Sequence, residues 1–300
     1  MWINNQSSLD DFILLGFSDR PWLETPFFVI FLVAYIFALL GNISIILVSH
    51  LDPQLDSPMY FFVSNLSLLD LCYTSSTVPQ MLVNLQGPEK TISCGGCVAQ
   101  LYIFLALGST ECILLAIMAF DRYAAICKPL HYPVIMNQRH CIHVATGTWI
   151  SGFANSLVQS TFTVLTPRCG QRVIDHFFCE VPALLKLACT DTHVNEAELN
   201  VLGALLLLVP LTLILAFNTC ASHLLVVSLF YFTAISMYVQ SPSSYSHDRG
   251  KIMALFYGIV TPTLNPFIYT LRNKDVKAAL RRALTKEFWV RTSSLAVSKQ

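Results

Sequence analysis

Charged residues are scarce in this sequence. Only 12% of its 300 residues are Asp, Glu, Lys or Arg, whereas 54% are hydrophobic, and the mean hydropathy is +0.58. Soluble domains usually carry about 25% charged residues, so this shortage excludes an ordinary soluble protein and indicates one that lies in lipid. Residues 1–26 are polar and mildly acidic, and they lack the early apolar core of a cleavable signal peptide.

Two further absences bear on the class of membrane protein. His143 and His223 are isolated, and Asp70 and Glu111 lack a partner base, so the nucleophile–base or metal constellation of a membrane enzyme is missing. Internal repeats, which many transporters show, are missing as well. We therefore predict that the chain is not an enzyme, and we keep a small-molecule transporter only as a distant alternative.

Long apolar runs are abundant. The first has 22 residues and no charge, and a helix needs about 20 residues to cross a bilayer. The runs are Phe27–Val48, Pro58–Leu82, Val98–Phe120, Ile142–Leu165, Leu199–Val239 and Ile252–Leu271. Because backbone groups in lipid find no water to bond, these runs must be helices. We predict an all-α membrane protein.

The run Leu199–Val239 is open to two interpretations. Its 41 residues barely supply two crossings, which need about 40 residues before any connection. One long helix would give six crossings, whereas two shortened helices joined at Phe217–Ser222 give seven. Seven crossings from an outside N-terminus put 11 of the 18 Lys and Arg residues in the cytoplasm, as the positive-inside rule requires. We therefore predict a seven-transmembrane helix bundle with shortened fifth and sixth helices.

The predicted layout has three parts. Residues 1–26 are an extracellular N-terminus, residues 27–271 form the seven-helix domain, and residues 272–300 are a cytoplasmic tail. Within the tail, basic and apolar side chains form two stripes along Lys274–Lys286. This pattern predicts a short interfacial helix on the inner leaflet, with membrane lipid as its partner.

Asp121-Arg122-Tyr123 closes the apolar run that begins at Val98. An acid beside an arginine at the cytoplasmic end of a membrane helix can act as a latch. The carboxylate holds the guanidinium inward, and its release frees a planar group with five donors for a partner. The sequence therefore predicts a membrane-embedded switch at this position.

The cysteines suggest disulfides on the outer side, where they are permitted. Four of the ten cysteines fall there: Cys97, Cys169, Cys179 and Cys189. Four cysteines allow three pairings, and Cys94 is a fifth candidate. We predict no metal site, because the thiols have a simpler use in disulfides. Asn5-Gln6-Ser7, in the outer N-terminus, is a candidate glycosylation site.

Several motifs together resemble a known family. They are Pro58–Phe62 (PMYFF), Leu66–Asp70 (LSLLD), Met118–Tyr132 (MAFDRYAAICKPLHY), Phe217–Leu224 (FNTCASHL) and Thr261–Lys277 (TPTLNPFIYTLRNKDVK). In this combination, which extends over nearly the whole chain, the sequence resembles the olfactory (odorant) receptors of the rhodopsin-like G-protein-coupled family. The resemblance implies a plasma-membrane receptor whose partners are a small volatile odorant and a heterotrimeric G protein of the olfactory stimulatory type. No nucleic-acid partner is expected.

The resemblance also implies roles for particular residues. It implies the disulfides Cys97–Cys179 and Cys169–Cys189, and it makes Arg122 the arginine that meets the G protein. It further implies a switch at the inner end of the seventh helix, Asn265-Pro266-Phe267-Ile268-Tyr269. Pro266 removes a backbone donor there and weakens the helix, so Tyr269 can swing with it.

Asp70 and Glu111 are acids inside the predicted spans, where a charge is costly and needs a partner. Asn42, Asn265 and a trapped cation are the natural partners, because hard cations take oxygen ligands. The family resemblance suggests a sodium site that favours the inactive state, with no other cofactor. The alternative is that burial keeps one of the acids protonated.

We expect the odorant pocket in the outer half of the bundle. Residues that share one face of the third helix and matching positions on later helices are the candidates: Phe104, Leu105, Gly108, Ser109, Leu202, Leu206, Tyr231, Ile235 and Tyr238. Together they would form a small, mostly apolar cavity with a few hydroxyls, which suits volatile organic molecules.

The sequence departs from the family in one region. Odorant receptors normally have a longer fifth helix, a basic third inner loop and a full inner half of the sixth helix, but here Leu211–Leu215 runs almost directly into Ala216–Cys220. This apparent deletion shortens the lever that activation swings outward. We therefore expect ligand binding with weak coupling to the G protein, and the alternative is a non-signalling receptor remnant from a pseudogene or defective allele.

Overall fold

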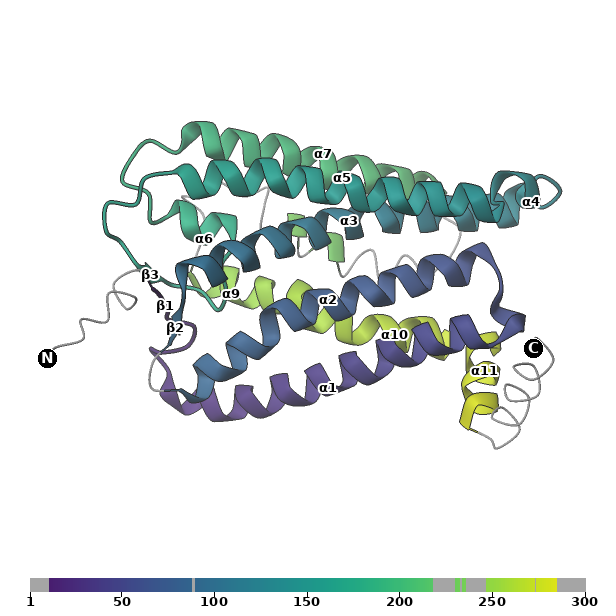
Figure 1. Ribbon diagram of the computed structural model, residues 1–300, viewed down its shortest axis with the longest axis horizontal. Helices are drawn as coiled ribbons and strands as arrows, with labels where there is room; N and C mark the ends of the chain where they lie inside the picture. Colours follow the sequence, from purple (N-terminus) through teal and green to yellow (C-terminus); the bar gives the residue numbers. More distant parts are fainter. Residues whose placement is uncertain are drawn as a thin grey trace, which may run out of the picture.

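The computed structural model describes residues 11–87, 90–217, 230–232, 234–235, 247–272 and 274–284. Long helices run side by side, with a small sheet at one end of the molecule and the short helices α4 and α11 at the other (Figure 1). We refer to these as the sheet end and the α11 end. The long helices are α1 (Pro21–Leu51), α2 (Pro58–Gln86), α3 (Cys94–Cys127), α5 (Gln138–Leu165) and α7 (His193–Phe217).

The last long segment consists of α9 (His247–Leu255), a π-helical turn η4 (Phe256–Val260) and α10 (Thr261–Arg272). Both α7 and this segment run from the sheet end toward the α11 end (Figure 1), so the chain returns between them. Residues 230–232 and 234–235 on this return are helical, and Phe230 and Tyr231 pack in the core with α3. The seven-helix fold is therefore confirmed, with α7 beginning six residues before the predicted run at Leu199.

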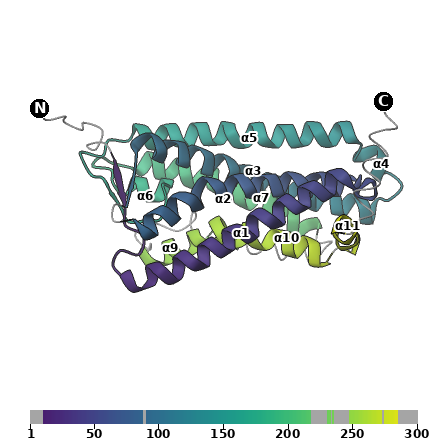
Figure 2. The same cartoon turned by 60° about the horizontal axis from the view of Figure 1, so that its bottom comes forward.

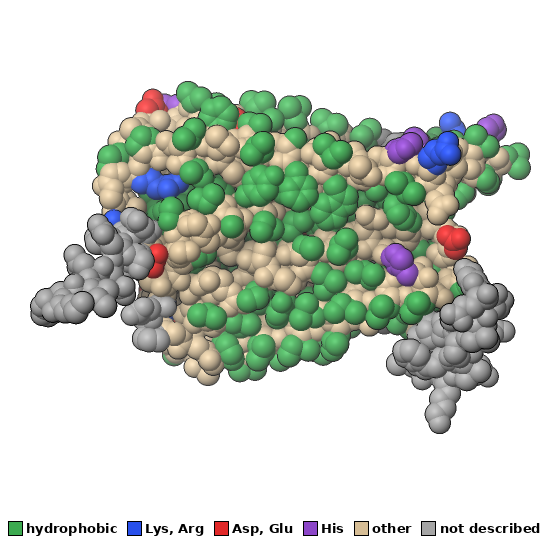
Figure 3. Space-filling view, in the orientation of Figure 1, with side chains coloured by type: hydrophobic (Ala, Val, Ile, Leu, Met, Phe, Trp, Pro, Cys, Tyr) green, Lys and Arg blue, Asp and Glu red, His purple; other side chains and the backbone are tan. Residues whose placement is uncertain are grey.

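The helices turn their apolar side chains outward. Three of the described helical segments are long and apolar enough by themselves to cross a membrane: Pro21–Leu51, Cys94–Cys127 and His193–Leu215. The helices α2 and α5 carry more polar residues, and several of these are buried between helices, among them Asp70, Ser156 and Gln159. Hydrophobic side chains cover the flank of the bundle, and charged side chains gather at its two ends (Figure 3). This is the arrangement that a lipid solvent favours.

A three-stranded sheet, which the sequence did not predict, caps one end. Its strands are β1 (Phe12–Leu14), β2 (Thr91–Ile92) and β3 (Val173–Ile174), in the order β2-β1-β3. β1 pairs antiparallel with β2 and parallel with β3. The sheet thereby ties the segment before α1 to the loops that precede α3 and follow α5.

Four short helices complete the described fold: η2 (Pro53–Leu55), α4 (Tyr132–Ile135), α6 (Val181–Leu185) and α11 (Lys274–Leu284). α11 lies across the end of the bundle (Figure 2), as expected for an interfacial helix. Its Val276 and Ala279 are buried in one cluster with Leu55, and Arg282 Nη2 donates to Asp52 Oδ2 at 2.6 Å.

The closest approach of α3 and α5 depends on a glycine. A Cβ atom at Gly152 would lie 2.7 Å from the carbonyl oxygen of Ala106 and would also overlap Thr110. Nearby, Ser156 Oγ donates to the carbonyl oxygen of Tyr102 at 2.6 Å. Both helices also line the cavity described below, so this contact sets the distance between α3 and α5 at the cavity.

We predict that Gly152→Ala destabilises the protein by about 1–3 kcal/mol, because the added methyl overpacks the α3–α5 contact. Thermal unfolding of the detergent-purified chain is the measurement. Gly147→Ala on the same helix is the matched control, since a Cβ there meets nothing within 4 Å and alanine favours the helix. Equal melting temperatures for the two variants would contradict the prediction.

Candidate functional site

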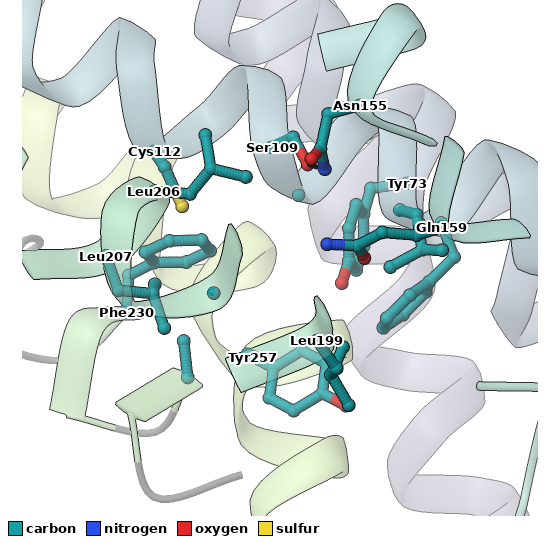
Figure 4. A pocket seen from close by; sticks show the side chains of 15 residues that line it. Tyr73, Ser109, Cys112, Asn155, Gln159, Leu199, Leu206, Leu207, Phe230 and Tyr257 are labelled. Carbon is teal, nitrogen blue, oxygen red and sulfur yellow. Dashed lines mark hydrogen bonds between the residues drawn. The ribbon is translucent and has the colours of Figure 1, made fainter. Parts of the chain in front are cut away.

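Figure 4 shows a cavity of the bundle from close by, and its volume is about 60 Å³. Its lining residues on α3, α5 and α7 place it in the half of the bundle nearer the sheet end. Five of the nine residues predicted to bind ligand line it: Phe104, Leu105, Gly108, Ser109 and Leu206. The first four come from one face of α3, as the helical spacing predicted. The cavity is small compared with drug-sized ligand pockets, which have about 300–1,000 Å³, so in this conformation it fits only a compact molecule.

Three of the other four predicted residues do not line the cavity. The cavity face of α7 consists of Leu199, Gly203, Leu206 and Leu207. Leu202 lies one position off this face, and Ile235 packs against the hydrophobic core instead. Tyr231 is buried and its hydroxyl donates to the carbonyl oxygen of Cys112 at 2.7 Å, while Tyr238 lies outside the described residues.

Four lining residues with polar side chains were not predicted: Tyr73, Asn155, Gln159 and Tyr257. Asn155 Nδ2 donates to Ser109 Oγ at 2.8 Å. Asn155 and Gln159 are four residues apart in a run without Asp, Glu, Lys or Arg, so they share one helix face. That spacing of two amides in an otherwise uncharged membrane span was the signal that could have identified them.

The loop between α5 and α7 covers the cavity. The disulfides Cys97–Cys179 and Cys169–Cys189 are formed, so the pairing implied by the family resemblance is confirmed. The first bond ties the loop to the beginning of α3, and the Cys179 N–H also donates to Gln100 Oε1 at 2.9 Å. In the same loop, the centroid of the Phe178 ring lies 4.9 Å from the centroid of the Phe104 ring, and Phe104 lines the cavity.

Buried polar groups hold the same loop to the last helical segment. Tyr257 of η4 donates its hydroxyl to Glu180 Oε2 at 2.6 Å, and Lys251 of α9 forms an ion pair with Asp175. His176 Nε2 lies 3.1 Å from Glu180 Oε1, although the two atoms are not aligned for a hydrogen bond. The pKa of His176 is lowered, because burial disfavours the imidazolium more than Glu180 favours it.

Asp70 and Glu111 are both 0% exposed. Asn265 Nδ2 donates to the two oxygens of Asp70 at 3.0 and 3.3 Å. Asn42 Nδ2 donates to the carbonyl oxygens of Ala38 and Pro262 at 2.9 and 3.2 Å. Within the described residues, four oxygens of this group find no hydrogen-bond donor: both of Glu111 and the amide oxygens of Asn42 and Asn265.

The predicted latch is closed. Asp121 is 1% exposed, and its Oδ2 accepts from Arg122 Nη2 at 2.6 Å and from Arg122 Nε at 3.1 Å. The other oxygen, Oδ1, accepts from the hydroxyl of Tyr132 at 2.8 Å. Burial, the hydrogen bond and the charge of Asp121 raise the pKa of Tyr132, so the phenol stays a donor. The sequence did not identify this third member.

The remaining switch residues lie apart from the latch. Tyr123 follows it and is half-buried. Asn265 contacts Asp70 in the interior, and Pro266 lies so close to α1 that a Cβ at Gly41 would be 2.8 Å from its ring. Asn5 and the side chain of Tyr269 lie outside the described part.

Comparison with known proteins identifies two matching families. Residues 41–228 match the family described as 7 transmembrane receptor (rhodopsin family), and residues 200–287 match the one described as Olfactory receptor. Within the described residues, no group of three or more His, Cys, Asp or Glu side chains could hold a metal ion.

Individual relatives agree with these families. Human olfactory receptor 2B2 is 61% identical over 306 residues, covering 95% of this chain and 85% of that protein. Mouse olfactory receptor 2B6 is 56% identical, covering 95% of this chain and 97% of its own length. Human olfactory receptor 2G3 is 58% identical, with 95% and 99% covered.

We predict that His176 makes stability fall below about pH 6.5, its ordinary pKa. Because its pKa is lowered in the folded protein, the unfolded chain takes up the proton first. Stability is thus fully present above pH 6.5 and declines as the pH falls, by at most about 1.4 kcal/mol per pH unit for one proton. The measurement is the melting temperature of the purified chain at about pH 7.5 and about 5.5.

His176→Gln should reduce this loss of melting temperature, because glutamine fills the site without titrating. His193→Gln is the control, since the His193 side chain is 88% exposed. An unchanged pH dependence in His176→Gln would refute the assignment.

Proposed function

Because the chain belongs to the olfactory receptors of the rhodopsin-like seven-transmembrane family, we propose that its cavity is the binding site for a small volatile odorant. Olfactory receptors are G-protein-coupled receptors rather than enzymes. The observation that carries the proposal is a mostly apolar cavity under a disulfide-tied loop, with the predicted face of α3 as one wall. Apolar burial with one or two hydrogen bonds suits such a ligand.

The partner at the other end is a heterotrimeric G protein of the olfactory stimulatory type. Opening of the latch would release Arg122 from Asp121 and expose its five donors. Tyr132 must release the same carboxylate, since it donates to Asp121 as well. The sheet end then faces outward and the α11 end inward in the plasma membrane, with Asn5 as an outer glycosylation site and lipid around α11.

Coupling of the receptor to the G protein depends on the region between α7 and residue 230. The predicted deletion falls partly on residues 218–229, which are outside the described structure. The alignment with human olfactory receptor 2B2 supports a deletion. It has 306 positions, but it covers only 95% of the 300 residues of this chain, which is 285 residues. About 20 positions thus lack a counterpart in this chain. The comparisons do not favour a non-signalling remnant, so we propose signalling of reduced amplitude.

We further propose that sodium binds beside Asp70 and Glu111. Two buried carboxyl groups and four oxygens without a donor within the described residues fit a hard cation. Asp70, Glu111, Asn42 and Asn265 would hold the ion. A bound cation would supply the positive charge that stabilises the two buried acids together.

We predict a dose-dependent cAMP rise in cells that express the chain and are exposed to an odorant mixture, because the latch residues are complete. Arg122→Ala should abolish it, since the released guanidinium contacts the G protein.

Replacing residues 211–235 by the aligned segment of human olfactory receptor 2B2 should increase the maximal response, because a longer helix gives a longer lever.

Staining of both termini in unpermeabilised cells serves as the control for trafficking and orientation, and only the N-terminus should be accessible. An Arg122→Ala variant that reaches the surface and still signals would refute the coupling role. A chimaera no stronger than the parent would refute the effect of the deletion.

For the cation, we predict that replacing potassium by sodium raises the melting temperature of the purified chain, because binding to the folded state stabilises it. Asp70→Asn should lose this response to sodium, whereas Asp56→Asn, a change at an exposed acid, should keep it. A sodium response that persists in Asp70→Asn would place the ion elsewhere.

A further inference from the structure

Gln159 is a lining residue whose side-chain amide bonds nothing in the part of the chain that the structure describes. It is 3% exposed and lines the cavity. Nothing in the described structure bonds its side-chain amide, although its backbone carbonyl oxygen accepts from Thr163 Oγ1 at 2.8 Å. Figure 4 shows the amide nitrogen pointing into the open centre of the cavity. A buried amide that lacks a partner is costly, so this position is suited to a bond with a ligand.

Two other polar groups around the cavity are already engaged. Tyr257 gives its hydroxyl hydrogen to Glu180. Ser109 Oγ accepts from Asn155, so its own hydroxyl hydrogen points away from that amide and is a second, weaker donor. The amide nitrogen of Gln159, which points into the cavity, and the hydroxyl of Ser109 can each donate a hydrogen bond to a ligand.

The walls of the cavity exclude a charged ligand. None of the described residues that line it is Lys, Arg, His, Asp or Glu, and the rest of the lining is mostly apolar. An ammonium or carboxylate group would lose its hydration there without a counter-charge. A pure hydrocarbon would fit the walls but would leave Gln159 unbonded.

We propose that Gln159 is the specificity-determining anchor of the cavity and that it selects compact, neutral molecules bearing one carbonyl acceptor, such as ketones, aldehydes or esters. The proposal rests on the cavity being the odorant site, as proposed above. The carbonyl oxygen accepts from the Gln159 amide, and the hydrocarbon part packs against the face of α7 and the ring of Phe104. The small volume of about 60 Å³ adds selection for size.

The test is ligand-induced stabilisation of the purified full-length chain, which does not require a G protein. The probes are a saturated ketone, the alkane of equal length and the carboxylate of equal length. The ketone should raise the melting temperature at concentrations where the alkane and the carboxylate have little effect. Gln159→Met, which keeps the length and shape of the side chain without its amide, should weaken ketone binding by about tenfold or more and leave alkane binding unchanged.

Comparing the three probes within one variant separates a change in ligand preference from a change in folding stability. Thr161→Val, at an exposed position two residues further along α5, is the control and should keep the preference for the ketone. Equal binding of ketone and alkane by the unmodified chain would overturn the inference, and so would a ketone preference that survives in Gln159→Met. If no member of a broad odorant panel binds the unmodified chain, the proposed function fails and not only the role of Gln159.

Discussion

Lipid provides no hydrogen bonds, and this constraint organises the whole molecule. Polar side chains that are buried in the spans must find partners within the protein. Most do so: Ser156 bonds Tyr102, and Asn265 bonds Asp70. The described groups that fail to do so are therefore informative, because a buried polar group without a partner needs an explanation. Glu111 and Gln159 are such groups, and they lie at two different depths of the bundle.

The helix α3 connects these depths. Over its 34 residues it carries the disulfide to the covering loop at Cys97, the cavity face around Gly108, the unbonded acid Glu111 and the latch at Asp121. One continuous helix thus touches the cavity, the buried acids and the latch. Backbone hydrogen bonds connect each turn of α3 to the next. A displacement of the helix at the cavity is therefore transmitted to its other end, where the latch lies.

The sequence predicts best what depends on short-range spacing. The face Phe104–Ser109 and the pair Asp121–Arg122 are local patterns, and both lie as predicted. The disulfide pairing needed the family resemblance, since spacing left three possibilities. Tyr132 escaped notice because its bond to Asp121 depends on how the loop after α3 folds back. Leu202 was wrongly placed in the cavity because α7 is apolar on all sides around this position, so its sequence does not reveal which face points inward.

Tyr257 joins the cavity to its cover. Its ring lines the cavity, and its hydroxyl bonds Glu180 in the loop that the Cys97–Cys179 disulfide holds in place. It lies in a π-helical turn, a geometry that often occurs at functional sites. The helix that follows carries Asn265, the partner of Asp70. A ligand that displaces the Tyr257 ring therefore acts on two structures at once: the bond that closes the cavity, and the helix that holds the buried acid.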